Sequence, residues 1–157
     1  MKYFYKYSYK FCNLFIAEEN NAICYVVFKK DRIYNSPEKF ENKETPLIKK
    51  AAKQLEEYFN KKRKEFDLPL VVNGTDFQNK IWKALQTIPY GKTCNYKELA
   101  SLAGNPKASR AAGMANNRNP ISIIIPCHRV IGANGDLTGY AGGLELKQKL
   151  LELEKLL

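Results

Sequence analysis

The chain contains four cysteines and one histidine, and Cys127 directly precedes that histidine, His128. A deprotonated thiol is a nucleophile, and an adjacent imidazole can accept its proton directly or through water. The pair follows the apolar run ISIII at 121–125, which has strand-like character, and precedes the glycine-rich segment IGANGDLTGYAGG at 131–143. This placement favours a nucleophile on a rigid support, facing a loop that a flat ligand can approach closely.

The same pair admits two plainer interpretations. Free cysteine is often a small buried hydrophobe, and Cys127 would then have no chemical role. Cysteine and histidine also bind zinc, but the chain has no CxxC pair, and a four-ligand site would need three or more distant cysteines. We therefore expect no metal. If Cys127 is a nucleophile, a third group must orient His128, and Glu152 and Glu154 are candidates.

The distribution of charge favours a polyanionic partner. The formal net charge is +10, and residues 75–129 hold eight Lys and Arg residues against two acidic residues. Residues 1–74 hold 15 against 10, which is a mixed surface. A basic segment with little acid to balance it is typical of nucleic-acid contact. A solvated basic face without a partner is the alternative, and charge alone does not separate the two.

The first half of the chain is expected to form a small α/β domain over residues 1–74. The segments FIA, AICYVVF and RIY within residues 3–34 are short and rich in β-branched and aromatic residues, which predicts strands. Residues 46–65 predict one helix that begins at Pro46, and residues 66–72 predict a further strand.

The second half, residues 75–157, is expected to be mainly helical, since composition changes at the turn NGT. Ala100 and Gly104 lie four residues apart where two short helices meet, which matches a helix-turn-helix motif. An ordinary helical hairpin is the alternative. The first predicted helix begins at a cap on Thr75 or Asp76. Three further helices are predicted over residues 95–104, 105–117 and 144–157.

The sequence shows no run long enough to cross a membrane and no apolar core of a signal peptide. We therefore expect a cytoplasmic protein without membrane contact, in which all four cysteines stay reduced. No exposed heptad pattern is evident, so we expect a monomer.

The segment IPCHRV at 125–130 resembles the active-site signature of the O6-alkylguanine-DNA alkyltransferases. The flanks agree with this resemblance: residues 91–120 (GKTCNYKELASLAGNPKASRAAGMANNRNP) resemble the family's DNA-binding segment, and residues 139–154 (GYAGGLELKQKLLELE) its carboxyl-terminal segment. The similarity is strong over about residues 75–156 and weak over residues 1–74.

The resemblance implies a two-domain α/β (α+β) fold. A ribonuclease-H-like domain over residues 1–74 would precede a winged-helix or helix-turn-helix domain over residues 75–157. It also implies a suicide repair reaction without a cofactor. Cys127 would take the alkyl group from O6 of a guanine in double-stranded DNA and keep it as a thioether, after the damaged nucleotide has rotated out of the duplex. O4-alkylthymine stays open as a second substrate.

The resemblance further assigns catalytic roles to four neighbours of Cys127. His128 would take the thiol proton through a bound water, and Glu154 would orient His128. Asn119 would bridge the helix-turn-helix to the active-site strand. Tyr96 would lie near the phosphate of the flipped nucleotide and the departing base, where proton donation improves the leaving group. A helix-packing aromatic is the alternative for Tyr96.

The resemblance also marks a DNA-contacting set and a pocket. Arg110 matches the finger that fills the gap left by the flipped base, and one more phosphate contact is its alternative. Arg129 matches an arginine that ties the active-site segment down. The DNA-contacting positions correspond to Tyr96, Lys97, Asn105, Arg110 and Ala133, and the pocket is assigned to Tyr140, Ala141, Gly142 and Met114.

Two positions depart from the family pattern. Ser122 stands where relatives often carry proline, which predicts a less rigid approach to the active site. Ala141 stands where relatives often carry a serine, so one hydrogen bond to the guanine would be missing. Three other functions compete with this interpretation: a lesion sensor without transfer, a non-catalytic helix-turn-helix regulator, and a Cys-His hydrolase. The sensors of this family usually carry tryptophan at the position of Cys127.

Overall fold

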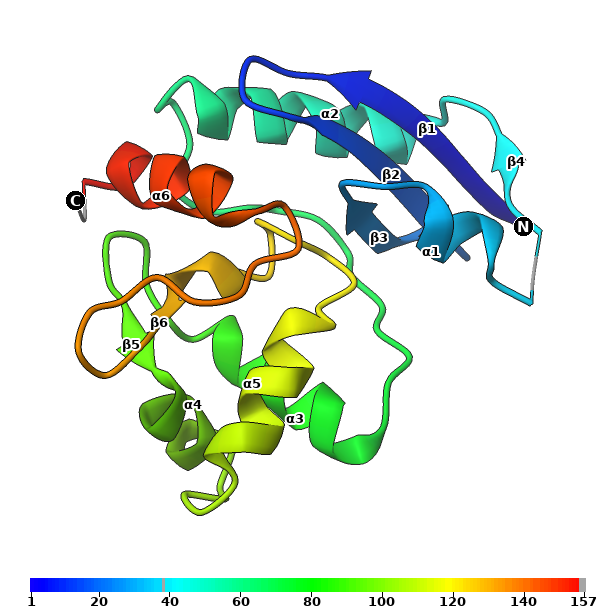
Figure 1. Cartoon of the computed structure of the whole chain (residues 1–157). Helices are drawn as coiled ribbons and strands as arrows, with labels where there is room; N and C mark the ends of the chain where they lie inside the picture. The colour runs from blue at the N-terminus through cyan, green and yellow to red at the C-terminus, as the bar shows by residue number, and fades with distance from the viewer. Residues whose placement is uncertain (38, 156–157) are drawn as a thin grey trace. The chain divides into compact units, whose positions relative to one another are not determined.

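The structure is a computed structural model that describes residues 1–37 and 39–155. The chain divides into two compact units, Met1–Val72 and Asn73–Leu157 (Figure 1). Among the described residues, no helix combines the length and the apolar character that crossing a bilayer requires.

The first unit is a four-stranded sheet with a helix packed on it. Its elements are β1 (Lys2–Ser8), β2 (Asn13–Glu19), β3 (Ala22–Val27), α1 (Asp31–Tyr34), β4 (Glu41–Asn42) and α2 (Pro46–Phe59). The strand order is β3-β2-β1-β4, with β4 parallel to β1 and the other pairs antiparallel. The helix α2 contacts β1, β2 and β3.

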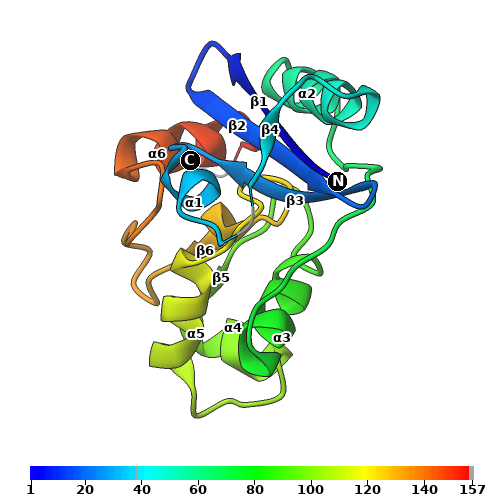
Figure 2. The ribbon, with the colours of Figure 1, turned by 90° about the vertical axis from the view of Figure 1, so that its right-hand side faces the viewer.

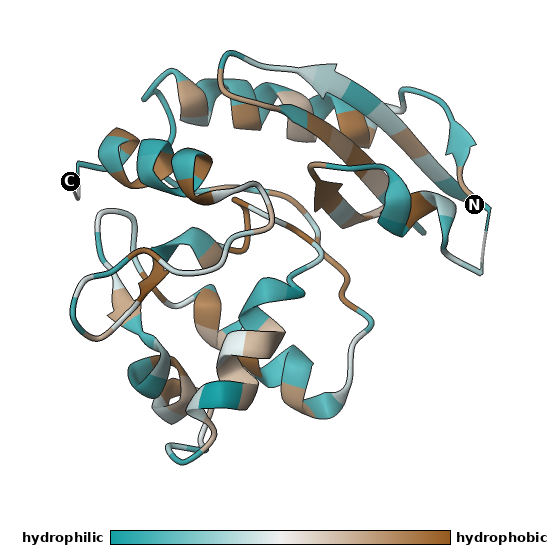
Figure 3. Ribbon diagram, viewed as in Figure 1, coloured by the Kyte–Doolittle hydropathy of each residue, from teal (hydrophilic) through white to brown (hydrophobic). Residues whose placement is uncertain are grey.

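The core of this unit lies between α2 and the sheet. Leu14 and Ile16 alternate along β2, and Ile48 and Leu55 lie two turns apart on α2; all four are fully buried. In Figure 3, β2 and β3 are largely brown, whereas α2 alternates brown and teal, as expected for a helix with one face on the sheet. Thr45 caps α2 by accepting a hydrogen bond from the Ile48 amide.

Two expected strands in this unit are wrong. The segment at 32–34 lies in the short helix α1, because the side chain of Ile33 joins the core cluster that contains Phe4 and Cys24 rather than a strand ladder. The segment 66–72 forms only one isolated bridge, between Leu70 and Ile23.

The helix expected over 46–65 ends at Phe59. Asn60 is its C-cap, and Lys61 adopts a left-handed backbone with φ of 60°. The following sequence, KKRKE, offers no apolar face that packing could reward.

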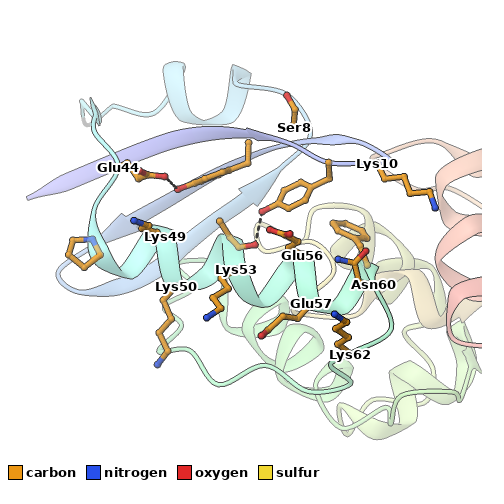
Figure 4. A pocket seen from close by; sticks show the side chains of 15 residues that line it. Ser8, Lys10, Glu44, Lys49, Lys50, Lys53, Glu56, Glu57, Asn60 and Lys62 are labelled. Carbon is orange, nitrogen blue, oxygen red and sulfur yellow. Dashed lines mark hydrogen bonds between the residues drawn. The ribbon is translucent and has the colours of Figure 1, made fainter.

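A groove of about 1070 Å³ runs along β1 and α2. Figure 4 shows Lys49, Lys50 and Lys53 on α2 together with Glu56. The Tyr7 hydroxyl donates to Glu44 at the edge of this groove (2.5 Å). Both lysines and glutamates line it, so this groove is a mixed-charge face rather than a concentrated basic surface.

The second unit is mainly helical and surrounds a two-stranded parallel ladder. Its elements are α3 (Asp76–Leu85), β5 (Cys94–Asn95), α4 (Tyr96–Leu102), α5 (Ser109–Asn117), the 3-10 helix η1 (Cys127–Arg129), β6 (Val130–Ile131) and α6 (Leu144–Leu153). The helices α3, α4 and α5 contact one another and lie side by side in Figures 1 and 2. The ladder pairs Cys94 with Val130.

The helices α3 and α4 begin at the predicted caps, whereas α5 begins at Ser109 and not at the predicted Asn105, because residues 105–108 continue the turn. Thr75 caps α3 and Asn95 caps α4, each in a capping box completed by the residue three positions later. Gly104, with φ of 85°, lies in the turn between α4 and α5, and Ala100 is fully buried. This geometry is that of a helix-turn-helix. The closing helix α6 is shorter than predicted, and residues 156–157 lie outside the described part of the chain.

The apolar run ahead of Cys127 is a buried turn and not the predicted strand. The Ile125 amide donates to the Ile121 carbonyl (3.0 Å), and the Ile124 amide to the Ser122 carbonyl (2.8 Å). These bonds close the segment on itself, and Ile123 has φ of 71°, an unfavourable conformation for a β-branched residue. A short run of apolar residues such as ISIII has the same pattern in a buried turn and in a buried strand, so the sequence does not distinguish the two.

Thr75→Val should lower the free energy of unfolding of the second unit by about 1 kcal/mol, because the Gln78 amide loses its cap. Thr75→Ser keeps the oxygen and should stay near wild type. Urea titration followed by the fluorescence of Trp82, the one tryptophan of the chain and a buried residue of α3, measures both. A Thr75→Val protein as stable as Thr75→Ser would contradict the capping argument.

Candidate functional site

Cys127 is the first residue of η1 and is only 4% exposed. The side chains of Asn119 and Ser122 hydrogen-bond to Cys127. Asn119 also fixes the turn around it, since its amide nitrogen donates to the Ile125 carbonyl (2.7 Å) and its oxygen accepts from the Ile121 amide (3.0 Å). The thiol therefore has a defined position at the end of a rigid segment.

The imidazole of His128 is held by Glu154. Nε2 of His128 lies 2.6 Å from Oε2 of Glu154, and both side chains are fully buried. The other candidate, Glu152, is exposed and accepts a hydrogen bond from Gln148 (3.0 Å). The geometry thus distinguishes the two glutamates, and Glu154 is the residue that contacts the histidine.

Glu154 also forms a buried ion pair with Arg129. Nε of Arg129 lies 2.8 Å from Oε1 of Glu154, and Nη2 of Arg129 donates to Oε2 of Glu154 (3.3 Å). Nη1 donates to the Ile88 carbonyl (2.7 Å), and the Gly91 amide donates to Glu154 (3.3 Å). Because Oε2 of Glu154 faces Nε2 of His128 and accepts a hydrogen bond from it, Nε2 carries the ring hydrogen, which leaves Nδ1 as the basic atom of the ring.

Burial dominates the electrostatics of the Cys127–His128 pair. It raises the pKa of the Cys127 thiol, while hydrogen bonding to Asn119 and the charge of Lys147 act in the opposite direction. Burial lowers the pKa of His128 despite the stabilising effect of Glu154. At neutral pH the resting pair is therefore a thiol next to a neutral imidazole, which is the protonation state that a general base needs.

Lys147 was not among the residues predicted from the sequence. Its side chain is fully buried. Nζ donates to the carbonyls of Val130 and Thr138, each at a distance of 2.6 Å. The sequence did contain a signal for a buried cation. Lys147 lies seven residues before Glu154 and on the same face of α6 as Leu150, so its charge interrupts an otherwise apolar face of this helix.

Asn116 and Thr138 were also not singled out from the sequence. Asn116 is buried on α5, and its amide nitrogen donates to the Cys127 carbonyl (3.4 Å). The Thr138 hydroxyl lies 2.5 Å from the hydroxyl of Tyr96. No sequence spacing marks either contact, because each joins segments that the fold alone brings together.

Tyr96 and the glycine-rich loop approach the same side of the site. The ring of Tyr96 packs over Gly113 of α5, where an added Cβ would lie 3.3 Å from Cδ1. Tyr140 is half-buried and meets His128 edge-on, with ring centroids 6.5 Å apart. Ala141 is exposed and Gly142 half-buried, both just before α6.

The remaining sequence-predicted residues lie on the surface. Arg110 is exposed in the first turn of α5, three residues before Gly113, and therefore on the face of α5 that carries the Tyr96 ring. Met114, on the same helix, is 61% exposed. Three others are also exposed, on α4, in the turn after it and in the loop after β6: Lys97, Asn105 and Ala133. Among the described residues, no three His, Cys, Asp or Glu side chains group as metal ligands.

Two family models match the chain. The one described as "6-O-methylguanine DNA methyltransferase, ribonuclease-like domain" covers residues 2–72, and the one described as "6-O-methylguanine DNA methyltransferase, DNA binding domain" covers residues 76–156. These matches confirm the expected fold of a ribonuclease-like domain followed by a DNA-binding domain.

Individual relatives agree with this result. A methylated-DNA–protein-cysteine methyltransferase of Methanosarcina acetivorans is 52% identical over 143 residues, which are 90% of this chain and 90% of the relative. The crystal structure of Mycobacterium tuberculosis O6-methylguanine methyltransferase is 41% identical with a TM-score of 0.87, covering 99% of this chain and 93% of that one. A crystal structure of the Mycobacterium tuberculosis protein in complex with DNA has the same TM-score at 42% identity, covering 98% and 92%.

The buried ammonium of Lys147 should make the stability of the protein depend on pH. Burial lowers its pKa from 10.5 to about 8. Between these values the unfolded chain holds the proton and the folded protein does not, so stability rises with pH. Relative to Lys147→Met, the wild-type free energy of unfolding should gain about 3 kcal/mol between pH 7 and pH 10.5.

Urea titrations of both proteins across this pH range, followed by Trp82 fluorescence, measure the difference. The control is Lys149→Met on the exposed part of α6, which should differ from wild type by a constant amount. A constant difference for Lys147→Met as well would show that no buried ammonium titrates.

Proposed function

The chain belongs to the O6-methylguanine DNA methyltransferase family and repairs alkylated DNA by suicide transfer, and we propose that Cys127 is the cysteine that accepts the alkyl group. The observation that supports this most is the chain of contacts from the buried Cys127–His128 pair through Glu154 to Arg129. It orients a base on the residue directly after a buried thiol, and a thiol with an oriented base is what nucleophilic catalysis requires.

The first step of the proposed reaction is a proton transfer. Nδ1 of His128 takes the proton from the Cys127 thiol through a water, and Glu154 stabilises the imidazolium that forms. Lys147 and the hydrogen bond to Asn119 stabilise the thiolate, because both favour its charged form.

The second step is the displacement itself. The sulfur of Cys127 forms a bond to the alkyl carbon, the bond between that carbon and O6 breaks, and the electron pair stays on the guanine. The Tyr96 hydroxyl gives its proton to the departing base, which makes the base a better leaving group. The thioether at Cys127 has no route back to the thiol, so each molecule acts once.

The helix-turn-helix brings the damaged base to this site. We assign α5 to the minor groove of double-stranded DNA, with Arg110 filling the gap after the O6-alkylguanine rotates out. Lys97 and Asn105, both exposed, contact the backbone, and Ala133 offers its main chain. Binding energy from these contacts offsets the cost of unstacking.

The loop after β6 forms the pocket for the extruded base. Tyr140 and Gly142 line it, Met114 borders it from α5, and Ala141 contributes no hydroxyl. The pocket admits O6-alkylguanine, and O4-alkylthymine is the second substrate to test. The protein acts as a monomer in the cytoplasm, where reducing conditions preserve the thiol, and these residues need no cofactor.

The transfer should be stoichiometric. After incubation with a duplex that carries O6-methylguanine, mass spectrometry of the digested protein should find one added CH2 on the peptide that contains Cys127. Cys127→Ser should show none and should still bind the duplex. An added CH2 on Cys12, Cys24 or Cys94 would contradict the assignment. Repair of more than one equivalent of O6-methylguanine per protein would also contradict it.

Arg110→Ala separates base extrusion from chemistry. Its repair of duplex DNA should fall at least about tenfold, because unstacking worth a few kcal/mol is no longer offset. Its reaction with free O6-benzylguanine should stay at the wild-type rate, since a free base needs no extrusion. Single-turnover kinetics on both substrates measure this.

Arg110→Lys is the matched control. It keeps the charge but not the planar guanidinium. Full duplex repair by this variant would show that Arg110 is one more phosphate contact, whereas repair close to that of Arg110→Ala supports the finger.

A further inference from the structure

We propose that Thr138 is a positioning residue for Tyr96: its hydroxyl donates a hydrogen bond to the phenolic oxygen and so directs the phenolic hydrogen toward the departing guanine. This inference rests on the proposed function and adds a residue of the glycine-rich loop to the reaction.

The phenol of Tyr96 is fixed at both ends. Its ring packs over Gly113, where an added Cβ would lie 3.3 Å from Cδ1 and 3.5 Å from Cε1, so α5 supports the ring along its length. Its hydroxyl lies 2.5 Å from Oγ1 of Thr138, a residue 42 positions away in the sequence. The two contacts together determine where the acidic proton of Tyr96 can point.

Thr138 is itself held in place by the loop. Its carbonyl accepts a hydrogen bond from the buried Nζ of Lys147 (2.6 Å). The next residue, Gly139, passes so close to Asn117 of α5 that an added Cβ would lie 3.0 Å from Nδ2. The loop is thus tied to α6 on one side and to α5 on the other, and the exposed Thr138 hydroxyl is presented from a defined backbone.

The direction of this hydrogen bond decides its effect. A threonine hydroxyl that donates to the phenolic oxygen leaves the phenolic hydrogen for the purine ring nitrogen, which accepts it as the C–O bond breaks. The same bond stabilises the phenolate that results, because hydrogen bonding to a charged form favours that form. The proton passes from Tyr96 to the guanine, and solvent later restores it.

The proposal predicts a dependence on the leaving group. Thr138→Val removes the hydroxyl with little change of shape, and its single-turnover rate with O6-benzylguanine should fall about threefold to tenfold, the effect of one hydrogen bond. With O6-benzyl-8-azaguanine, whose electron-poor base leaves more easily without an acid, the loss should be clearly smaller. Thr138→Ser should restore the wild-type rate with both substrates.

A double variant tests the route of the effect. If Thr138 acts through the Tyr96 hydroxyl, Tyr96→Phe should show the same leaving-group dependence, and adding Thr138→Val to it should cost nothing more. Thr75→Val, which weakens the cap of α3, is the stability control and should not change the ratio of the two rates.

Equal losses with both bases, additive losses in the double variant, or no rescue by Thr138→Ser would overturn this inference. These outcomes differ from a failure of the proposed function, in which the wild-type protein itself would leave Cys127 unalkylated.

Discussion

The buried carboxylate of Glu154 organises the candidate site in the second unit. It contacts the imidazole of His128, the guanidinium of Arg129 and the amide of Gly91. A buried charge destabilises a protein unless its partners are all in place. The end of α6, the helix η1 and the segment after α3 must therefore assemble together. The geometry of the Cys127–His128 pair follows from this requirement and not from local sequence alone.

The helix α6 and its C-cap supply two opposite charges to the Cys127–His128 pair, Lys147 acting on the thiol and Glu154 on the imidazole. Lys147 and Glu154 lie two turns apart on the buried face of α6. Glu154 holds the imidazole of His128, and Lys147 favours the thiolate, while burial opposes ionisation of Cys127. In the proposed reaction this balance keeps the resting sulfur protonated and protected, and it forms the nucleophile only when His128 takes the proton. A reagent used once benefits from this arrangement, because premature alkylation or oxidation is irreversible.

The sequence predicted features that are encoded locally. The capping residues Thr75 and Asn95, the helix-turn-helix around Gly104 and the Cys127–His128 pair all depend on a few neighbouring positions. Contacts between distant segments were not predictable in this way. Lys147 was missed because its partners are main-chain carbonyls, which leave no pattern in side-chain types. The strand expected at 32–34 is a helix because tertiary packing of Ile33 outweighs β propensity.

In the run ISIII at 121–125, hydrogen bonds to other residues determine the backbone, and the local composition does not. Its composition predicts a strand, and Ser122 in place of proline predicts a less rigid approach to the thiol. In the structure Ser122 is buried, bridges to Ile125 and hydrogen-bonds to Cys127. The unfavourable backbone of Ile123 persists because Asn119 ties both ends of the turn. Rigidity that proline would supply through its ring is thus supplied here by hydrogen bonds, and the serine hydroxyl also stabilises the thiolate, which a proline cannot do.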